Sequence, residues 1–376
     1  MVGRHSPQHA RRTRPSGAEE LSTSDDRLRT LGTRLPGLGV GSTSSLGRAR
    51  VGGGVGRLAL VLVVFAVVVA AGVQWFRPLP SPTLHTAVST VLRIPGTAPA
   101  LPWPSGAPAA LAVSDGPLIG SSGPETPVPI AGLAKMMTAY VVVKDHPLAT
   151  GSDGPAIAVT PDALAAFQAQ STNGESVVPL ASGESLSELQ VLQGLVVASG
   201  NDMATLLADF DAGGTKGFVA KMNSTAHALG MRSTTFTDPV GLDPGTVSTP
   251  RDLLHLADAV LGVPALRQMV AMTEVTLPLA GRVFNLNSNL GRGGFIGLKT
   301  GSDTAAGGCF LFAAQRPVAG TNVTLVGAIV GVHGPTPTNS ALSDAAALVD
   351  AAFATSGPQP AVGRDSVLGD VAAPWT

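Results

Sequence analysis

The stretch PIAGLAKMMTAY, at residues 129–140, is the segment around which the predicted fold is organised. It predicts the start of a helix that continues as an apolar run to Val143 and ends before Pro147, because proline disfavours a helix at the residue that precedes it. Lys135 lies one helical turn after Gly132, so the two positions share one face of the helix. The stretch therefore predicts a helix that presents a lysine, with a glycine on the same face one turn before it.

The segments around this helix predict a sheet that is interrupted by helices. Short apolar runs bounded by turn residues predict strands at residues 109–113, 117–119, 156–159, 175–178, 274–277, 282–286, 294–301, 308–314 and 322–332. Residues 185–270 predict an all-helical block that opens on the capping box Ser185-Leu186-Ser187-Glu188, and a last helix covers residues 341–354. Strands, a helical insertion, more strands and a final helix together predict an α+β domain.

Composition argues against several kinds of site. Cys309 is the only cysteine, so the chain cannot form an internal disulfide, and its apolar neighbours predict a small buried side chain. None of the seven histidines has the spacing of metal ligands, so we expect no metal site and no cofactor. The sequence has no glycine-rich phosphate loop and no basic-aromatic stripe, so we expect no nucleic-acid partner.

The N-terminal region predicts a single-pass membrane anchor. Residues 1–57 hold ten arginines and four acidic residues, a net charge of +6, with few large apolar side chains, so we expect a disordered tail. Residues 58–76 are an apolar run of 19 residues; at about 1.5 Å per residue, a helix of this length just crosses a bilayer core of about 30 Å. The excess of arginine before the run predicts a cytoplasmic N-terminus and an extracytoplasmic remainder.

A cleaved signal peptide is the alternative to the anchor, because Ala70-Ala71-Gly72 offers the small residues of a cleavage site. The 57-residue leader is long for such a peptide, and we prefer the anchor. Prolines recur after the span, so residues 77–102 are expected to form an extended spacer. Residues 103–355 are then the folded domain, and residues 356–376 a flexible tail that contains glycine and proline.

Three short motifs occur in a fixed order, Gly132-x-x-Lys135, Ser199-Gly200-Asn201 and Lys299-Thr300-Gly301. Each of them alone is common, as a lysine facing solvent, a helix-breaking loop or a surface turn. Their joint order, with 64 and 100 residues between Lys135, Ser199 and Lys299, is a far more specific signal. A serine at position 132 would turn the first motif into Ser-x-x-Lys, the nucleophile-plus-lysine motif of penicillin-recognising acyl-transfer enzymes.

These motifs and the segments around them resemble the serine-type D-alanyl-D-alanine carboxypeptidases, the low-molecular-weight penicillin-binding proteins. The resemblance covers about residues 103–354 and includes further matching segments at 129–131, 137–140, 183–184, 199–204, 222–223, 238–242, 248–249 and 297–301. It implies a β-lactamase/DD-peptidase-like α+β fold, in which an antiparallel sheet is flanked by helices and carries an all-helical subdomain. It also implies a bacterial cell-membrane protein of peptidoglycan metabolism.

The resemblance implies catalytic roles for the matching residues. Lys135 would activate the nucleophile at position 132, which here is Gly132. Ser199 would relay a proton towards the leaving group, and Asn201 would hydrogen-bond the peptide backbone of the substrate. Lys299 would supply a positive field at the edge of the sheet.

A second set of matching residues would bind substrate. Thr300, Gly301 and Ser302 would lie along the terminal carboxylate of a D-Ala-D-Ala stem peptide, which suits a site with two nearby ammonium groups. The backbone N–H groups at Gly132 and Ser302 would form the oxyanion hole. The ligand class implied by the resemblance is therefore the D-Ala-D-Ala end of a peptidoglycan stem peptide.

Gly132 departs from the family pattern at the decisive position. It has no oxygen that could form an acyl-enzyme, and loss of the nucleophile in a serine protease lowers turnover by on the order of 10⁶. We therefore expect a D-Ala-D-Ala-binding protein with impaired carboxypeptidase activity, which binds β-lactams at most non-covalently. We find no matching acidic deacylation residue, which argues against a β-lactamase.

The alternative is an active serine-type carboxypeptidase that uses a substitute nucleophile or a water molecule. Ser121 and Ser122, in a predicted turn before the helix, are the candidate hydroxyls. Thr138 lies well away from the face of Gly132, because six residues at 100° each rotate it by about 600° around the helix.

Overall fold

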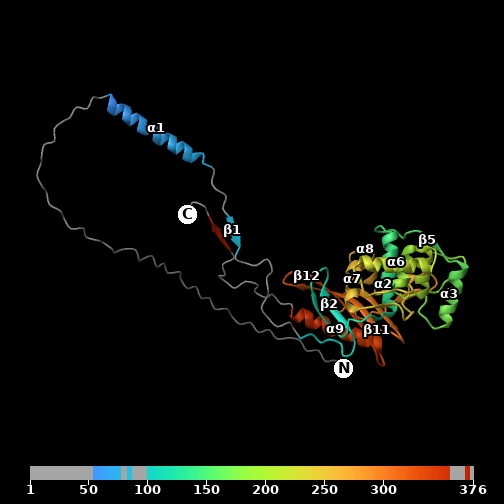
Figure 1. Cartoon of the computed structure of the whole chain (residues 1–376). Coiled ribbons are helices and arrows are strands. Elements are labelled where there is room, and N and C mark those ends of the chain that lie inside the picture. The colour runs from blue at the N-terminus through green and yellow to red at the C-terminus, as the bar shows by residue number, and fades with distance from the viewer. Residues whose placement is uncertain (1–53, 78–82, 87–99, 356–368, 373–376) are drawn as a thin grey trace, which may run out of the picture. The chain divides into compact units, whose positions relative to one another are not determined.

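The computed structural model describes residues 54–77, 83–86, 100–355 and 369–372 (Figure 1). The chain divides into two units, one that contains the apolar N-terminal helix and one that contains the folded domain. Nearly all of the tail expected at residues 1–57 lies outside the described residues, as do most of the linker expected at 77–102 and most of the tail expected at 356–376.

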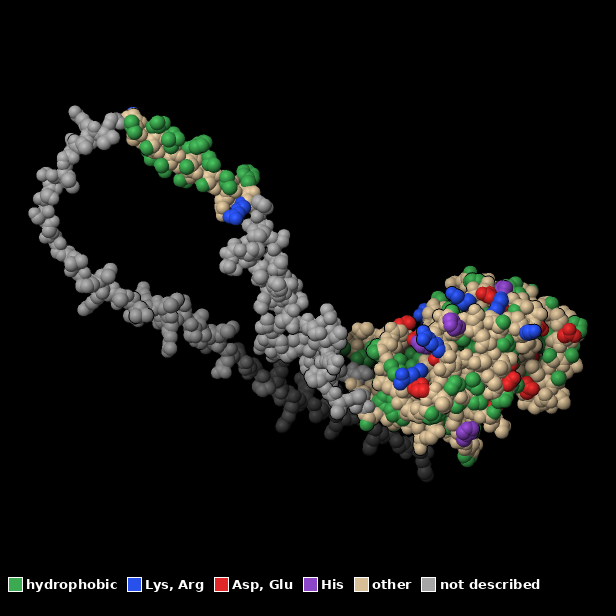
Figure 2. All heavy atoms as spheres, viewed as in Figure 1, with side chains coloured by type: hydrophobic (Ala, Val, Ile, Leu, Met, Phe, Trp, Pro, Cys, Tyr) green, Lys and Arg blue, Asp and Glu red, His purple; other side chains and the backbone are tan. Residues whose placement is uncertain are grey.

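The N-terminal unit contains α1 (Val55–Trp75), a helix of 21 residues with a mean hydropathy of 2.6 in its most apolar stretch. None of its residues is buried, and Figure 2 shows apolar side chains along its length. Its residues from Leu58 to Val73 are uninterruptedly apolar, a composition typical of a membrane span. Among the described helices, α1 is long and apolar enough by itself to cross a membrane.

Two short strands lie in segments for which the sequence predicted no regular structure. β1 (Thr83–Thr86) and β13 (Gly369–Ala372) pair with each other as a two-stranded sheet. They belong to the expected linker and the expected C-terminal tail. A strand of four residues offers too few alternations for its sequence pattern to stand out from a loop, and the two strands were therefore missed.

The domain is organised around a five-stranded antiparallel sheet with the strand order β10-β11-β12-β2-β3. Its strands are β2 (Ala109–Val113), β3 (Leu118–Ser122), β10 (Phe295–Asp303), β11 (Gly307–Val318) and β12 (Thr321–Val332). The last strand pairs with the first, with Leu325 opposite Val113. The helical block is thus inserted between two parts of one sheet, and the predicted α+β fold is confirmed.

Side chains alternate between the two faces of the sheet because successive residues of a strand point in opposite directions. On one face, Phe310 and Phe312 pack against α9 (Pro337–Thr355). On the other face, Cys309 and Leu311 pack in the larger core beneath the remaining helices. Cys309 is fully buried as predicted, and burial raises the pKa of its thiol to about 12, so the thiol stays protonated.

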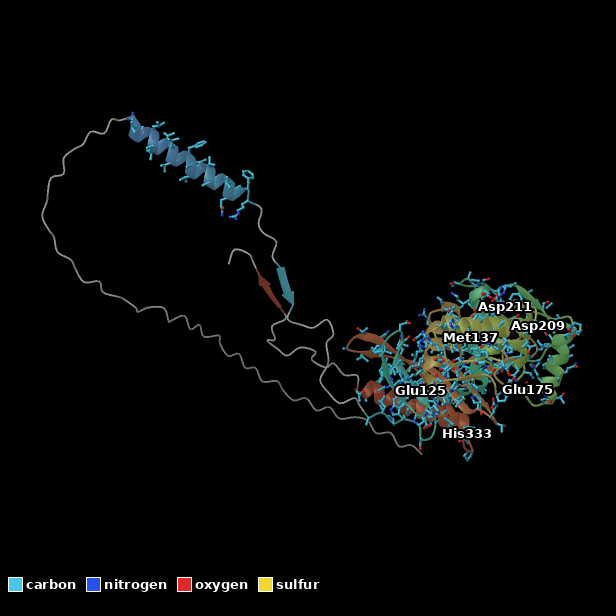
Figure 3. All side chains as sticks on the ribbon, in the orientation of Figure 1. Glu125, Met137, Glu175, Asp209, Asp211 and His333 are labelled. Atoms are coloured by element: carbon cyan, nitrogen blue, oxygen red, sulfur yellow. The ribbon has the colours of Figure 1, made fainter. Side chains whose placement is uncertain are left out.

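The helix α2 (Ala134–Asp145) occupies the centre of this larger core. It contacts five other helices, which are α4 (Glu188–Val196), α5 (Asn201–Ala212), α6 (Thr215–Ala228), α7 (Pro250–Leu261) and α8 (Pro264–Val270). Nine of its residues are buried, among them Met137, which Figure 3 labels among the helices. Residues 134–143 of the helix are mostly apolar because protein surrounds them, and this buried position fixes the direction in which Lys135 points.

The remaining elements are short and lie around this core. They are η1 (Ala131–Leu133), α3 (Pro161–Thr172) and three two-stranded sheets, β4 (Val128–Pro129) with β7 (Val247–Ser248), β5 (Ala156–Ala158) with β6 (Ser185–Ser187), and β8 (Glu274–Leu277) with β9 (Gly281–Phe284).

Three local predictions were wrong. Residues 175–178 form no strand, and the strand predicted at 117–119 continues to Ser122. The capping box lies two residues later than predicted. The Ser187 hydroxyl accepts a hydrogen bond from the backbone N–H of Gln190, and the Gln190 side chain accepts one from the backbone N–H of Ser187 at 2.9 Å. Residues 185–187, where the box was predicted, instead pair with β5, so tertiary pairing outweighed the local capping pattern.

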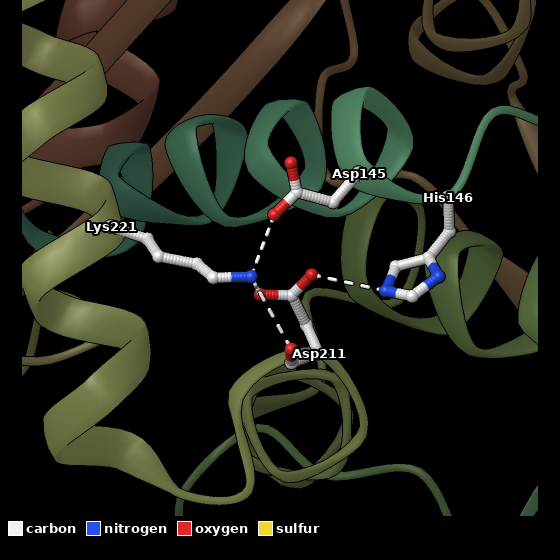
Figure 4. A network of polar contacts seen from close by, with 4 residues as sticks. All are labelled: Asp145, His146, Asp211 and Lys221. Atoms are coloured by element: carbon white, nitrogen blue, oxygen red, sulfur yellow. Dashed lines mark hydrogen bonds and ion pairs between the residues drawn. The ribbon is translucent and has the colours of Figure 1, made fainter.

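A polar cluster ties the C-terminal end of α2 to α5 and α6 (Figure 4). The Asp211 carboxylate, whose side chain is fully buried, accepts from Lys221 Nζ at 2.8 Å and pairs with His146 Nε2 at 3.1 Å. Lys221 also donates to Asp145 at 2.7 Å, and this hydrogen bond holds the pKa of Asp145 below its usual value. The cluster closes the end of the central helix opposite to Lys135.

We expect the substitution Asp211→Ala to lower the free energy of unfolding by about 2 kcal/mol. Loss of one partner from a buried pair costs about 3–5 kcal/mol, but Lys221 and His146 are 40% and 34% exposed and can be solvated. Urea denaturation of the full chain in detergent measures this change. The matched control is Glu274→Gln in the exposed pair with Arg282, which should cost less than about 1 kcal/mol. Equal losses in both variants would contradict this account of the cluster.

Candidate active site

Gly132 lies in a tight turn at the start of the central helix. The turn η1 leads directly into α2, so the predicted helix begins with a 3-10 turn. Ala131 has φ = +45°, a left-handed conformation that is uncommon for residues other than glycine. Gly241 approaches this turn so closely that a Cβ on it would lie 1.8 Å from the Ala131 carbonyl oxygen. Only glycine fits at position 241, and the loop that contains it supports the turn.

The loop at residues 238–243 is itself fixed by side-chain contacts. The Asp238 carboxylate accepts hydrogen bonds from the backbone N–H groups of Gly241 and Asp243, the latter at 2.6 Å. From α2, the hydroxyl of Thr138 donates to the carbonyl oxygen of Pro239 at 2.7 Å. The hydroxyl of Thr138 is therefore engaged in holding this loop, in agreement with its predicted position away from Gly132.

The edge strand β10 runs directly past Gly132. A Cβ on Gly301 would lie 2.6 Å from the backbone nitrogen of Gly132 and 3.1 Å from that of Leu133, too close for any side chain. Gly301 therefore permits the strand to approach the start of the central helix. This approach brings Thr300 and Ser302, 168 and 170 residues further along the sequence, next to position 132.

The two motif lysines are both buried, each with 3% of its surface exposed. Lys135 Nζ donates to the hydroxyl of Ser199 at 3.2 Å, and Lys299 Nζ donates to the carbonyl oxygen of Thr300 at 2.9 Å. Burial lowers the pKa of Lys135 to about 8, although the nearby carboxylates of Asp202, Asp238 and Glu175 oppose the shift. Burial, and then the charge of Lys135, lower the pKa of Lys299 well below its usual value.

The second motif forms the start of α5. Ser199 has φ = +61° and Asn201 is the first residue of the helix. The Asn201 amide donates to Glu175 Oε2 at 2.8 Å. The next residue, Asp202, accepts from the backbone N–H of Val178 at 3.1 Å, and burial raises its pKa to about 6. The loop before β6 is thus fastened to the helix that carries Ser199.

The three motifs line one cavity of about 460 Å³. All but one of the predicted site residues line it, namely Gly132, Lys135, Ser199, Asn201, Thr300, Gly301 and Ser302. Lys299 is the exception, because its side chain is buried beside the strand, where it holds the Thr300 carbonyl group. The Thr300 hydroxyl oxygen is buried and has no hydrogen-bond partner among the described residues.

The space beside Gly132 could accommodate a side chain. A Cβ at this position would lie 3.6 Å from Lys135 Nζ, from the Thr300 carbonyl oxygen and from Gly301 Cα, all of which are ordinary van der Waals distances. The first side-chain carbon of a serine could therefore occupy position 132 without displacing its neighbours. The glycine is not required by the packing of the turn, in contrast to Gly241 and Gly301.

The sequence did not reveal every residue of the cavity. Glu175, which Figure 3 labels, lines the cavity from the loop that follows α3. Its β-branched neighbours Val177 and Val178 had instead predicted a strand at residues 175–178. The hydroxyls of Ser121 and Ser122, which the sequence suggested as substitute nucleophiles, lie on β3 and do not line the cavity. Ser121 instead accepts a hydrogen bond from Arg251 at 2.9 Å.

Comparison with known proteins identifies the family that the three motifs resemble. The model of the family described as D-alanyl-D-alanine carboxypeptidase matches residues 107–329. The D-alanyl-D-alanine carboxypeptidase DacC of Escherichia coli is 34% identical over 187 residues, which are 47% of this chain and 45% of that protein. DacB2 of Mycobacterium tuberculosis is 37% identical over 188 residues, 48% of this chain and 62% of that protein. The chain thus spans about half the length of the relatives that it matches.

Two solved structures resemble the domain. A D-alanyl-D-alanine carboxypeptidase from Mycobacterium tuberculosis has a TM-score of 0.57 and 30% identity, over 75% of this chain and 99% of that one. A DD-transpeptidase from Streptomyces has a TM-score of 0.59 and 26% identity, over 69% of this chain and all of that one. Since the family match covers more than half of the chain and includes all three motifs, the protein belongs to the D-alanyl-D-alanine carboxypeptidase family.

Proposed function

We propose that the domain binds peptidoglycan stem peptides ending in D-Ala-D-Ala, and that Gly132 strongly impairs their turnover. The proposal rests on the groups that surround position 132 in the cavity. Lys135 and Ser199 are hydrogen-bonded to each other, Thr300 and Ser302 lie beside them, and there is room for a side chain at 132 that the chain does not use. Binding groups are retained, while the nucleophile is missing.

The charges of the cavity favour a carboxylate ligand. Lys135 and Lys299 are buried close enough for the charge of one to lower the pKa of the other. A carboxylate bound near both would relieve this repulsion and would be favoured by the low polarity around them. The unpartnered hydroxyl of Thr300 is then available to donate to the same carboxylate. These groups fit the terminal carboxylate of D-Ala-D-Ala.

We further propose that α1 anchors this domain at the extracytoplasmic face of a bacterial cell membrane. The apolar surface of α1 after Arg57 suits a lipid environment, and the ten arginines of residues 1–57 favour a cytoplasmic N-terminus. Stem peptides are built into the wall outside the membrane, so this orientation would place the cavity on the side of its ligand. Residues 77–102 would be the spacer between span and domain.

The first prediction of this proposal concerns the missing nucleophile. We expect Gly132→Ser to raise D-Ala-D-Ala carboxypeptidase turnover by on the order of 10³ to 10⁶, because the serine would fit beside Lys135. Release of D-alanine from a stem pentapeptide measures the rate. The matched control is Gly262→Ser, an exposed glycine outside the cavity, which should leave the rate unchanged. Equal rates in the wild type and Gly132→Ser would show that Gly132 is not the cause of impairment.

The second prediction concerns binding. Titration calorimetry of the wild type with a D-Ala-D-Ala peptide should give a saturable heat, and a peptide ending in L-Ala-L-Ala should not. Thr300→Val should weaken binding by about 10- to 100-fold, since a hydrogen bond to a charged group contributes about 1.5–3 kcal/mol. Thr321→Val, the same change at the distant and exposed end of β12, is the control. Binding that Thr300→Val leaves intact would place the carboxylate elsewhere.

The third prediction concerns pH. Lys135 is protonated below its pKa of about 8 and neutral above it, and a bound carboxylate favours the protonated form. Affinity for the D-Ala-D-Ala peptide should therefore fall by up to about 10-fold as the pH rises from 7 to 9. Calorimetry across this range measures the change, and Lys135→Met should remove it. An affinity that rises with pH would contradict the role of Lys135 as a cation for the ligand.

A further inference from the structure

We propose that Ser199 is the substitute nucleophile of this protein, and that the Lys135–Ser199 pair forms a slow covalent acyl-enzyme with β-lactams that enter the cavity. The inference rests on the proposed function, since it requires ligands of the D-Ala-D-Ala class to reach this cavity. It departs from the sequence-based expectation that β-lactams bind only non-covalently.

The geometry sets Ser199 apart from the other hydroxyls. Its Oγ is 3.2 Å from Lys135 Nζ, and Ser199 lines the cavity although only 6% of its surface is exposed. The same Nζ lies 3.6 Å from the place of a Cβ at position 132. Lys135 therefore contacts both the usual position of the nucleophile, which is empty of any oxygen, and the hydroxyl of Ser199. A serine and a lysine in hydrogen-bond contact are the two components that nucleophilic catalysis of this kind requires.

Lys135 can act as the base for this serine. With a pKa of about 8, roughly a tenth of the Lys135 side chains are neutral at pH 7 and most are neutral at pH 9. The hydrogen bond that the ammonium group donates to Ser199 is then reversed, so that the hydroxyl donates to a neutral amine. Proton transfer to Nζ leaves an oxygen nucleophile that faces the cavity.

The covalent step balances within the protein and the β-lactam. The Ser199 oxygen forms a bond to the carbonyl carbon of the lactam, and the carbon–nitrogen bond of the ring breaks. The proton that Lys135 accepted is transferred to the departing ring nitrogen. No atoms are lost, so the protein gains the whole mass of the β-lactam as an ester on Ser199.

Other hydroxyls near the cavity lack this arrangement. The Thr138 hydroxyl donates to the carbonyl oxygen of Pro239, and Ser121 lies on β3 in contact with Arg251. Thr300 is close to a lysine in sequence, but Lys299 Nζ contacts its carbonyl oxygen rather than its hydroxyl. Among the hydroxyls that line the cavity in the described part of the chain, Ser199 is therefore the one that is hydrogen-bonded to a lysine, a side chain that can accept a proton.

The same geometry explains why the reaction should be slow. Ser199 and position 132 are separate neighbours of Lys135 Nζ, so a carbonyl carbon attacked by Ser199 is displaced from the place that a nucleophile at 132 would reach. The backbone N–H of Gly132 is then poorly placed for the developing oxyanion, and loss of one such donor costs about 10² to 10³ in rate. We expect acylation of the wild type to be at least about 10²-fold slower than that of Gly132→Ser.

The experiment is to locate the adduct. Full-length protein in detergent is incubated with excess benzylpenicillin at pH 8.5, and its intact mass is followed over hours. The wild type should gain the mass of one penicillin, and peptide sequencing by mass spectrometry should place the ester on Ser199. Ser199→Ala should lose the adduct, whereas Ser121→Ala should retain it. In Gly132→Ser the adduct should form faster and lie on residue 132.

Three results would overturn the inference. They are a wild type that stays unmodified while Gly132→Ser is acylated, an adduct on a residue other than Ser199, and an adduct that persists in Ser199→Ala. Because the adduct is mapped in the wild type, the answer does not depend on whether Ser199→Ala folds. Failure of the proposed function is separate: in that case the wild type gives no heat with the D-Ala-D-Ala peptide and Gly132→Ser is not acylated either.

Discussion

The close approach of β10 to the start of α2 is the constraint on which the rest of the site depends. It exists because Gly301 has no side chain, so that the strand can pass the backbone nitrogen of Gly132. On the other side, Gly241 allows the 238–243 loop to support the left-handed turn at Ala131. The buried central helix then fixes Lys135 between the strand and Ser199. Contacts between backbone segments, which need no side chain at position 132, therefore determine the shape of the cavity.

The contacts that build the fold at position 132 do not require the side chain that would take part in the reaction. Position 132 contributes its backbone to the contact with β10, while its side chain would point at Lys135. Loss of a serine there would remove an oxygen and leave the packing unchanged. Lys135 is buried, with its pKa lowered, although position 132 is a glycine. A cavity that contains a lysine with a lowered pKa can therefore persist without an oxygen at position 132.

Much of the fold could be predicted from the sequence, because the strands of the central sheet have long apolar or β-branched runs and the helices have clear ends. Tertiary contacts caused the errors. The capping box moved to Ser187 because residues 185–187 pair with β5, and residues 175–178 became a loop that Asp202 and Asn201 hold. In the site, motif order indicated which residues would meet, and the cavity brings all of them together except Lys299. Glu175 and the hydrogen bond between Lys135 and Ser199 depend on side-chain placement that no sequence pattern encodes.

The central claim is that the cavity is complete for binding and lacks only the oxygen at position 132. A crystal structure of the wild-type protein with a D-Ala-D-Ala stem peptide tests it most directly. The account predicts an intact peptide in the cavity, with its terminal carboxylate at Thr300 and Ser302 and its last peptide carbonyl at the backbone N–H of Gly132, within about 3 Å as in an oxyanion hole. A peptide bound elsewhere, or a carboxylate far from Thr300, would contradict it.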